Sequence, residues 1–254
     1  MLNNAIITGI IVGTITGIIM LVLEYGIFDN DKTTVIVLSE GFEIPQKFQS
    51  DEKDIVEPPV TLPPLDFKIN YLYRPVGYDH FKLLKTDSVL KSHDHYKIIF
   101  TPVEESYVYI FQMDSAGKIY QLFPMKSFKN MVLNNTNPVQ VNITHYIPGK
   151  DKSFALDERT GTETIYFLAT RQPDIELEQQ YQQVQMAQYK KEAIPLKLAE
   201  ADFIKTLHQR KPTEITDDTQ MINWTEQGQS FMVVQQQLVD LCQNCVQTLS
   251  FKHQ

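Results

Sequence analysis

The clearest alternation of hydrophobic and polar positions lies near the middle of the chain. Tyr107–Met113 (YVYIFQM) is rich in β-branched and aromatic side chains, as is typical of a β-strand. Asp114 and Gly117 then supply turn chemistry, because an aspartate can bond to the backbone two residues further on and a glycine adopts positive φ at no steric cost. A second short run, Lys118–Phe123, stops before Pro124, which has no N–H for a strand ladder. We expect a β-hairpin around which the domain folds.

Other short apolar runs, separated by turn residues, indicate further strands. The predicted strands besides the hairpin are Lys68–Tyr73, Tyr96–Pro102, Ile143–Ile147 and Thr162–Thr170. In Thr162–Thr170 (TETIYFLAT), one face carries Ile165 and Phe167 and the other carries Tyr166 and Leu168. Because both faces are apolar, this run is predicted to be a central strand that is covered on both sides.

The hydrophobic period changes to that of a helix after Pro173. Asp174 can cap a helix, and Pro195 interrupts the helical pattern, so two helical runs are predicted at about 174–210. Lys211–Asp218 has the composition of a polar loop.

We expect a third helix at Ser230–Cys242 and a last strand at Val246–Phe251. The predicted fold class is α+β: a mainly antiparallel, β-sandwich-like domain at residues 67–254, with C-terminal helices at about 174–210 and 230–242.

The N-terminus has a different pattern. Ala5–Leu23 contains 19 residues without a charged side chain. As a helix it is roughly 28 Å long, close to the roughly 30 Å of a bilayer core. A cleaved signal peptide is the alternative, but a positively charged start and a small-residue cleavage site are missing. The sequence therefore predicts a transmembrane anchor at residues 1–28 that contacts membrane lipid through residues 5–23.

Three glycines in this segment, Gly9, Gly13 and Gly17, recur at every fourth position. They lie on one side of a helix, where small residues allow a second helix to approach closely. The same spacing also arises by chance in membrane helices, so both interpretations stay open. No Lys or Arg precedes the segment, and we expect a single-pass protein whose globular domain is periplasmic or extracellular.

The stretch at residues 29–66 is predicted to connect anchor and domain. It contains a short β-branched run, Thr33–Leu38, and five of the thirteen prolines. Proline at this density favours an extended path, as expected for a spacer.

Composition narrows the possible functions. The formal net charge is −8 and the basic residues are scattered, which argues against nucleic acid as a partner. Hydrophobic residues make up 43% of the chain, enough for a folded core.

A family resemblance adds to this picture. The motifs that carry it are Tyr73-Arg74 with Gly77, Leu90-Lys91-Ser92, Tyr96-Lys97-Ile98, Phe100-Thr101-Pro102, Tyr107–Phe111, Asp114-Ser115 with Gly117, Leu122-Phe123-Pro124, Asn137-Pro138, and Gly161 with Glu163-Thr164. In order and spacing, residues 71–171 resemble the bacterial family known as domain of unknown function 4384. The resemblance implies a β-rich domain that is often attached to signalling kinases, caspase-like peptidases or envelope proteins, without an established activity. It supplies no catalytic residue, and Ser92-His93-Asp94 stands where members commonly have Ser-Gly-Asp.

Two groups of residues, a cysteine pair and a set of histidines, are candidates for a redox or ligand-binding site. Cys242 and Cys245 have the spacing of a redox motif, but they follow a predicted helix, whereas a reactive pair sits at a helix start. A local disulfide or two buried thiols is the expected state. His93 and His95, joined by His80 or His145, are candidates for a metal or ligand sensor, although a solvated turn explains His93–His95 equally simply.

The remaining polar groups form no recognisable catalytic set. The serines lack the context of a nucleophile elbow, and the acidic residues flank predicted turns; they are Ser92, Ser106, Ser115, Asp151, Asp157, Glu158 and Glu163. We therefore predict no cofactor and no enzyme activity. The expected function is that of a membrane-anchored interaction module of the bacterial envelope or of a signalling complex, bound to an unidentified protein or to further copies of itself. A small-ligand or metal sensor and a CxxC redox factor are the alternatives.

Overall fold

The computed structural model describes residues 14–15, 18–19, 63–128 and 131–254, and the side chains of 126–134 are left out of the account. The chain divides into two units, Met1–Glu57 and Pro58–Gln254. All three clusters of buried hydrophobic residues lie in the second unit, which therefore has its own core.

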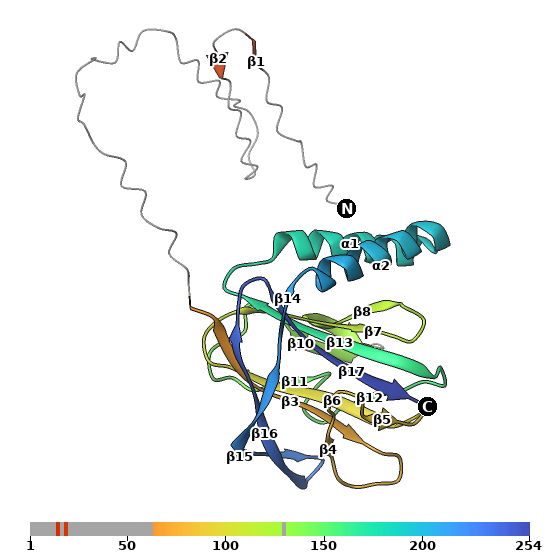
Figure 1. The fold of residues 1–254 in the computed structure, drawn as a ribbon, viewed down its shortest axis with the longest axis vertical. Helices are drawn as coiled ribbons and strands as arrows, with labels where there is room; N and C mark the ends of the chain where they lie inside the picture. Colours follow the sequence, from red (N-terminus) through yellow and green to blue (C-terminus); the bar gives the residue numbers. More distant parts are fainter. Residues whose placement is uncertain (1–13, 16–17, 20–62, 129–130) are drawn as a thin grey trace, which may run out of the picture. The chain divides into compact units, whose positions relative to one another are not determined.

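Two sheets form the second unit (Figure 1). In the described residues, the first sheet has the order β11 (His145–Ile147), β6 (His95–Pro102), β3 (Leu65–Arg74), β16 (Gln229–Leu241) and β15 (Ile215–Glu226), with β12 (Phe154–Ala155) beside β6 and β4 (Lys82–Leu83) beside β3. The second has the order β14 (Lys211–Thr213), β17 (Cys245–His253), β13 (Gly161–Thr170), β7 (Tyr107–Met113) and β8 (Ile119–Phe123), with β5 (Val89–Leu90) beside β17. Most pairs are antiparallel, but β14 and β5 run parallel to β17. A separate antiparallel pair consists of β9 (Met125–Phe128) and β10 (Met131–Asn135).

The main core lies between the two sheets. Phe67 of β3 packs against Phe167 of β13, with ring centroids 5.1 Å apart, and Phe100 of β6 packs against the same ring. Ile110 of β7 belongs to this cluster too. The core therefore joins strands of both sheets into a sandwich.

Helices α1 (Ile175–Lys190) and α2 (Ala193–His208) cover the other face of the second sheet (Figure 1). Phe203 of α2 packs against Phe111 of β7, with centroids 4.8 Å apart. Asp174 caps α1 as predicted, since its Oδ1 accepts a bond from the Leu177 N–H. β13 lies between β17 and β7 and is buried on both faces, which confirms its predicted central place.

A third cluster covers the outer face of the first sheet. Trp224 and Phe231 stack from β15 and β16, and Phe81 packs against both. A buried ion pair lies beside these rings: Lys97 Nζ is 2.5 Å from Glu226 Oε2. Burial lowers the pKa of Lys97, because a charged ammonium is costly away from water.

The predicted central hairpin is confirmed. β7 and β8 pair in antiparallel register, and the Asp114 carboxylate accepts bonds from the N–H groups of Ala116 and Lys118. Gly117 has a φ of 78°, which a side chain would disfavour.

The prediction for residues 211–242 is wrong. β14 and β15 occupy most of the expected polar loop, and the expected helix at Ser230–Cys242 is the strand β16. β15 and β16 form a hairpin whose two turn residues, Gln227 and Gly228, both have positive φ. Positive φ at both central residues is the signature of a two-residue hairpin turn, and it outweighs the helix propensity of the glutamines in β16.

Most of the predicted N-terminal features lie outside the described residues: the spacer strand Thr33–Leu38, nearly all of the proline-rich stretch, and Gly9, Gly13 and Gly17. Of Ala5–Leu23, only the short antiparallel pair β1 (Thr14–Ile15) and β2 (Ile18–Ile19) is described. Neither described helix is long and apolar enough to cross a bilayer. The membrane anchor stays a prediction.

Candidate functional site

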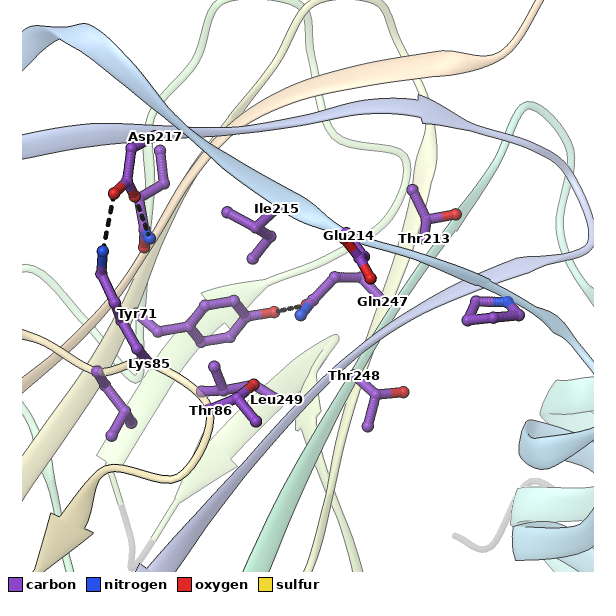
Figure 2. Close-up of a pocket in the computed structure, with 13 residues that line it drawn as sticks. Tyr71, Lys85, Thr86, Thr213, Glu214, Ile215, Asp217, Gln247, Thr248 and Leu249 are labelled. Carbon is purple, nitrogen blue, oxygen red and sulfur yellow. Dashed lines mark hydrogen bonds and ion pairs between the residues drawn. The ribbon is translucent and has the colours of Figure 1, made fainter.

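A cavity of about 580 Å³ opens where the chain crosses from the second sheet to the first (Figure 2). The crossing segment runs from β14 through Glu214 into β15, and β17 forms the opposite side. The volume lies within the range of about 300–1,000 Å³ that is usual for small-molecule sites. The lining residues are Tyr71, Leu84, Lys85, Thr86, Pro212, Thr213, Glu214, Ile215, Asp217, Gln236, Gln247, Thr248 and Leu249.

Buried polar side chains form the floor of this cavity. The Tyr71 hydroxyl donates a 2.5 Å hydrogen bond to Gln247 Oε1 (Figure 2). Burial raises the pKa of Tyr71, so the hydroxyl keeps its proton and acts as a donor. Gln236 is 5% exposed, and its Oε1 atom has no hydrogen-bond partner among the described residues.

Charged side chains stand at the rim. Lys85 Nζ lies 2.8 Å from Asp217 Oδ2, and Gln236 Nε2 donates to Asp217 Oδ1 over 3.0 Å. These two bonds lower the pKa of Asp217, because both favour the carboxylate. Glu214 adds a second, exposed carboxylate.

The cavity lining contains many polar side chains. They supply hydroxyls, amides and one ion pair, and there is no serine, cysteine or histidine among them.

A second unusual surface lies at the junction of the two helices. Tyr189 and Met186 end α1, and Ile194 and Leu198 begin α2; their exposed fractions are 89%, 55%, 76% and 62%. We call these four residues the helix-end patch. The other ends of the helices are anchored, as where Phe203 and Leu207 are fully buried on the sheet.

The helix-end patch has an excess of lysines among its charged neighbours, although the exposed Asp202 lines the same hollow as Met186 and Leu198. Lys190, Lys191 and Lys197 are exposed beside it, and Glu192 is the acidic residue between them. This local balance contrasts with the net charge of −8 for the whole chain. The patch therefore combines apolar area with positive charge.

Three buried or half-buried side chains have the order of a serine hydrolase triad. Ser92 Oγ lies 3.1 Å from His253 Nε2, and His253 Nδ1 lies 3.8 Å from Glu163 Oε1. Gln112 Nε2 donates to the Glu163 carboxylate over 2.8 Å. This set was not predicted from the sequence. Ser92 and Glu163 are 71 residues apart, Glu163 and His253 are 90 residues apart, and no local motif marks them.

The surroundings of Ser92 argue against hydrolysis. The Ser92 N–H donates to Gln254 O, and the His93 N–H donates to Leu156 O. Both amides that would stabilise an oxyanion are thus already occupied. We interpret the set as a polar joint that ties the end of β17 to β13.

The histidines weighed as metal ligands are not brought together. His93 is an exposed turn residue with a φ of 70°, whereas His80 contacts Asp79 and Tyr78 at the surface. His145 pairs with Phe100 in the sheet, five positions along β6 from His95, or roughly 16 Å. The described residues contain no group of three or more potential metal ligands.

Cys242 and Cys245 form a disulfide in the turn between β16 and β17. The Cys245 N–H donates to Cys242 O within this turn. Since no helix begins here, the dipole that activates a redox-active thiol is missing.

The other polar candidates have structural partners or lie at the surface. Ser106 pairs its backbone with Val139, and the Ser115 N–H donates to Glu163. Asp151 accepts a bond from the Gln227 N–H, and Asp157 accepts one from the Arg159 N–H. Glu158 is exposed.

Comparison with known proteins bears on one third of the chain. A family model described as domain of unknown function (DUF4384) matches residues 89–173, which span β5 to β13. Neither the curated proteins nor the solved structures contain a match. All residues that line the cavity, and both helices, lie outside the matched range. Residues 89–173, from β5 to β13, are thus a DUF4384 domain that contributes strands to both sheets.

Proposed function

We propose that the chain is a non-enzymatic interaction module, held at a membrane by residues 5–23, that docks another protein of the bacterial envelope or of a signalling complex. The observation that carries the proposal is the exposure of the helix-end patch, Met186, Tyr189, Ile194 and Leu198. An exposed apolar surface often marks an interaction site, and Met186 lines one hollow with Tyr189 and another with Leu198.

The chemistry of the patch defines its partner. Tyrosine, isoleucine and leucine side chains projecting from two helices fit an apolar groove on another protein. Lys190, Lys191 and Lys197 favour carboxylates at the border of that groove, since opposite charges steer and orient association. The partner is therefore a protein with an apolar, acid-bordered groove.

The patch belongs to an element that suits this role. The helices are fixed to the sheet by Tyr109, whose hydroxyl donates to Glu178, and by Tyr181, whose hydroxyl accepts from the Gln121 N–H. A rigid support lowers the conformational entropy that binding costs.

The test is affinity purification of the full chain from detergent-solubilised membranes of its own host. We would compare the wild type with the double variant Ile194→Ser, Leu198→Ser, and with Val103→Ser as the control at a somewhat less exposed apolar site (52%) outside the patch. The wild type and the control are expected to recover one protein in a constant ratio. The double variant is expected to recover at least about tenfold less of this partner protein, because apolar anchors dominate binding energy.

Three outcomes would contradict the proposal. Full recovery by the double variant would place the partner elsewhere, and recovery of the chain alone would show that no other protein binds it stably. Binding of the fragment 58–254 to phosphatidylglycerol vesicles, lost in the double variant, would assign the patch to lipid.

The alternative functions have weaker support. The disulfide lies in a strand–strand turn, and the histidines proposed for a sensor are spread over the domain. Neither arrangement shows a reactive or ligating centre.

A further inference from the structure

We infer that the cavity between the β14–β15 crossing and β17 binds an uncharged, hydroxyl-rich small molecule of the saccharide class. This site is separate from the helix-end patch, so the inference does not depend on the proposed docking function. The walls of the cavity come from β3, the loop before β5, the β14–β15 segment, β16 and β17 (Figure 2).

The charges of the cavity exclude most ionic ligands. Its two carboxylates, Glu214 and Asp217, face one cation, Lys85, which is already paired with Asp217. An anionic ligand would meet a net negative rim without a free cation. A cationic ligand would find both oxygens of Asp217 engaged, one by Lys85 and one by Gln236, and would be left with the exposed carboxylate of Glu214 at the rim.

The floor of the cavity offers uncharged hydrogen-bond acceptors and donors. Gln236 Oε1 is a buried acceptor without a partner among the residues described, and a buried unpaired acceptor costs roughly 1–3 kcal/mol until a donor reaches it. The carboxamide of Gln247 uses its oxygen for Tyr71, which leaves the N–H donors of its Nε2 atom for another partner. Ligand hydroxyls can donate to the first group and accept from the second.

The remaining lining suits the same class. Thr213 and Thr248 add hydroxyls from opposite sides of the opening, and Ile215 and Leu249 add apolar surface (Figure 2). A saccharide ring has polar edges and an apolar C–H face, so it matches this mixture. An apolar ligand would leave the buried amides unpaired, at a cost that the few aliphatic side chains do not offset.

The experiment is a ligand titration of fragment 58–254, which contains the complete core. Binding is monitored by NMR of the backbone amides. The probes are D-glucose, N-acetyl-D-glucosamine and cellobiose. Glucose 6-phosphate is the anionic comparator with the same ring, and spermidine is the cationic one. We expect saturable shifts at Thr213, Gln236 and Thr248 with at least one neutral sugar, and at least about tenfold weaker binding of both charged comparators, equivalent to about 1.4 kcal/mol.

Two variants show whether the shifts report the cavity. Thr248 is exposed, and Thr248→Val removes its hydroxyl while keeping the shape of the side chain. Gln236→Met removes the buried acceptor at similar volume. Each should weaken sugar binding severalfold, while Thr162→Val, at an exposed threonine of β13 outside the cavity, should not. Absence of saturation with all three sugars, equal or tighter binding of a charged comparator, or unchanged binding by both cavity variants would overturn the inference.

Discussion

Lys97 and Glu226 show how individual residues constrain this fold. Lys97 is fully buried on the outer face of the first sheet, where its Nζ also donates to Lys150 O over 2.8 Å. Glu226 comes from the last position of β15, so the pair ties the β15–β16 hairpin to β6. A buried charge is tolerated only while its partner is present.

Replacing Glu226 by Gln should therefore destabilise the protein strongly. We expect a loss of about 3–5 kcal/mol in the free energy of unfolding, because the variant leaves the ammonium of Lys97 without its counter-charge. Urea denaturation of fragment 58–254 measures this. The double variant Lys97→Met, Glu226→Leu should lose much less, and Lys85→Met, in an exposed ion pair, should lose only about 0–1 kcal/mol. A change within about 1 kcal/mol for Glu226→Gln would contradict the buried pair.

Glu163 gives a prediction about pH. Burial raises the pKa of this carboxyl above its ordinary 4.5, and the nearby Asp114 raises it further, whereas His253 and the bonds from Gln112 and Ser115 act in the opposite direction. The folded protein thus keeps the Glu163 proton to higher pH than the unfolded chain does, and folding stability falls as pH rises through that window. Measured from pH 4.5 upward, the free energy of unfolding of the wild type should fall relative to that of Glu163→Gln. A parallel pH dependence of the two proteins would show that Glu163 titrates normally.

At the scale of elements, β7 links the two hydrophobic layers. Its neighbouring residues Ile110 and Phe111 point to opposite faces, so that Ile110 lies between the sheets and Phe111 lies under the helices. Both are at most 1% exposed. This strand belongs to the matched family range.

Truncation on either face of β7 should have a similar cost. Ile110→Ala and Phe111→Ala are each expected to lose about 2–5 kcal/mol of stability, since each leaves a cavity in a packed layer. Val103→Ala, at a half-exposed position, should change stability by less than about 0.5 kcal/mol. Thermal and urea unfolding provide the comparison, and a mild effect at Phe111 would mean that the helices pack loosely on the sheet.

The elements also show where sequence reasoning succeeds. Tyr107–Phe123 and Thr162–Thr170 were predictable, because alternation, β-branched residues and turn chemistry agree there. Ser230–Cys242 was not, because its glutamines favour a helix, while the turn that makes it a strand, Gln227–Gly228, lacks the usual Asn-Gly or Asp-Gly form. The cavity could not be predicted at all, since Tyr71 of β3 and Gln247 of β17 belong to different sheets and meet only where the two sheets pack together.

The whole molecule is expected to consist of a membrane anchor, a spacer and a domain with its own core. If residues 5–23 cross the membrane uncleaved, the full chain should resist alkaline extraction from membranes and keep its N-terminal residues in mass spectrometry. Fragment 58–254 should be found in the soluble fraction. A processed N-terminus near Glu24 would contradict the anchor.

The helix-end patch is the proposed docking surface, and its occupancy in cells can be measured directly. A photoreactive phenylalanine analogue placed at Tyr189, which is 89% exposed, reports what touches the patch; the same analogue at Tyr78, 57% exposed on another surface, is the matched control. The proposed docking function predicts one discrete light-dependent adduct with a different protein at position 189 and none at position 78. It also predicts that the adduct is lost when Leu198→Ser is added. No adduct at position 189, an adduct only with a second copy of the chain, or the same adduct at both positions would contradict it.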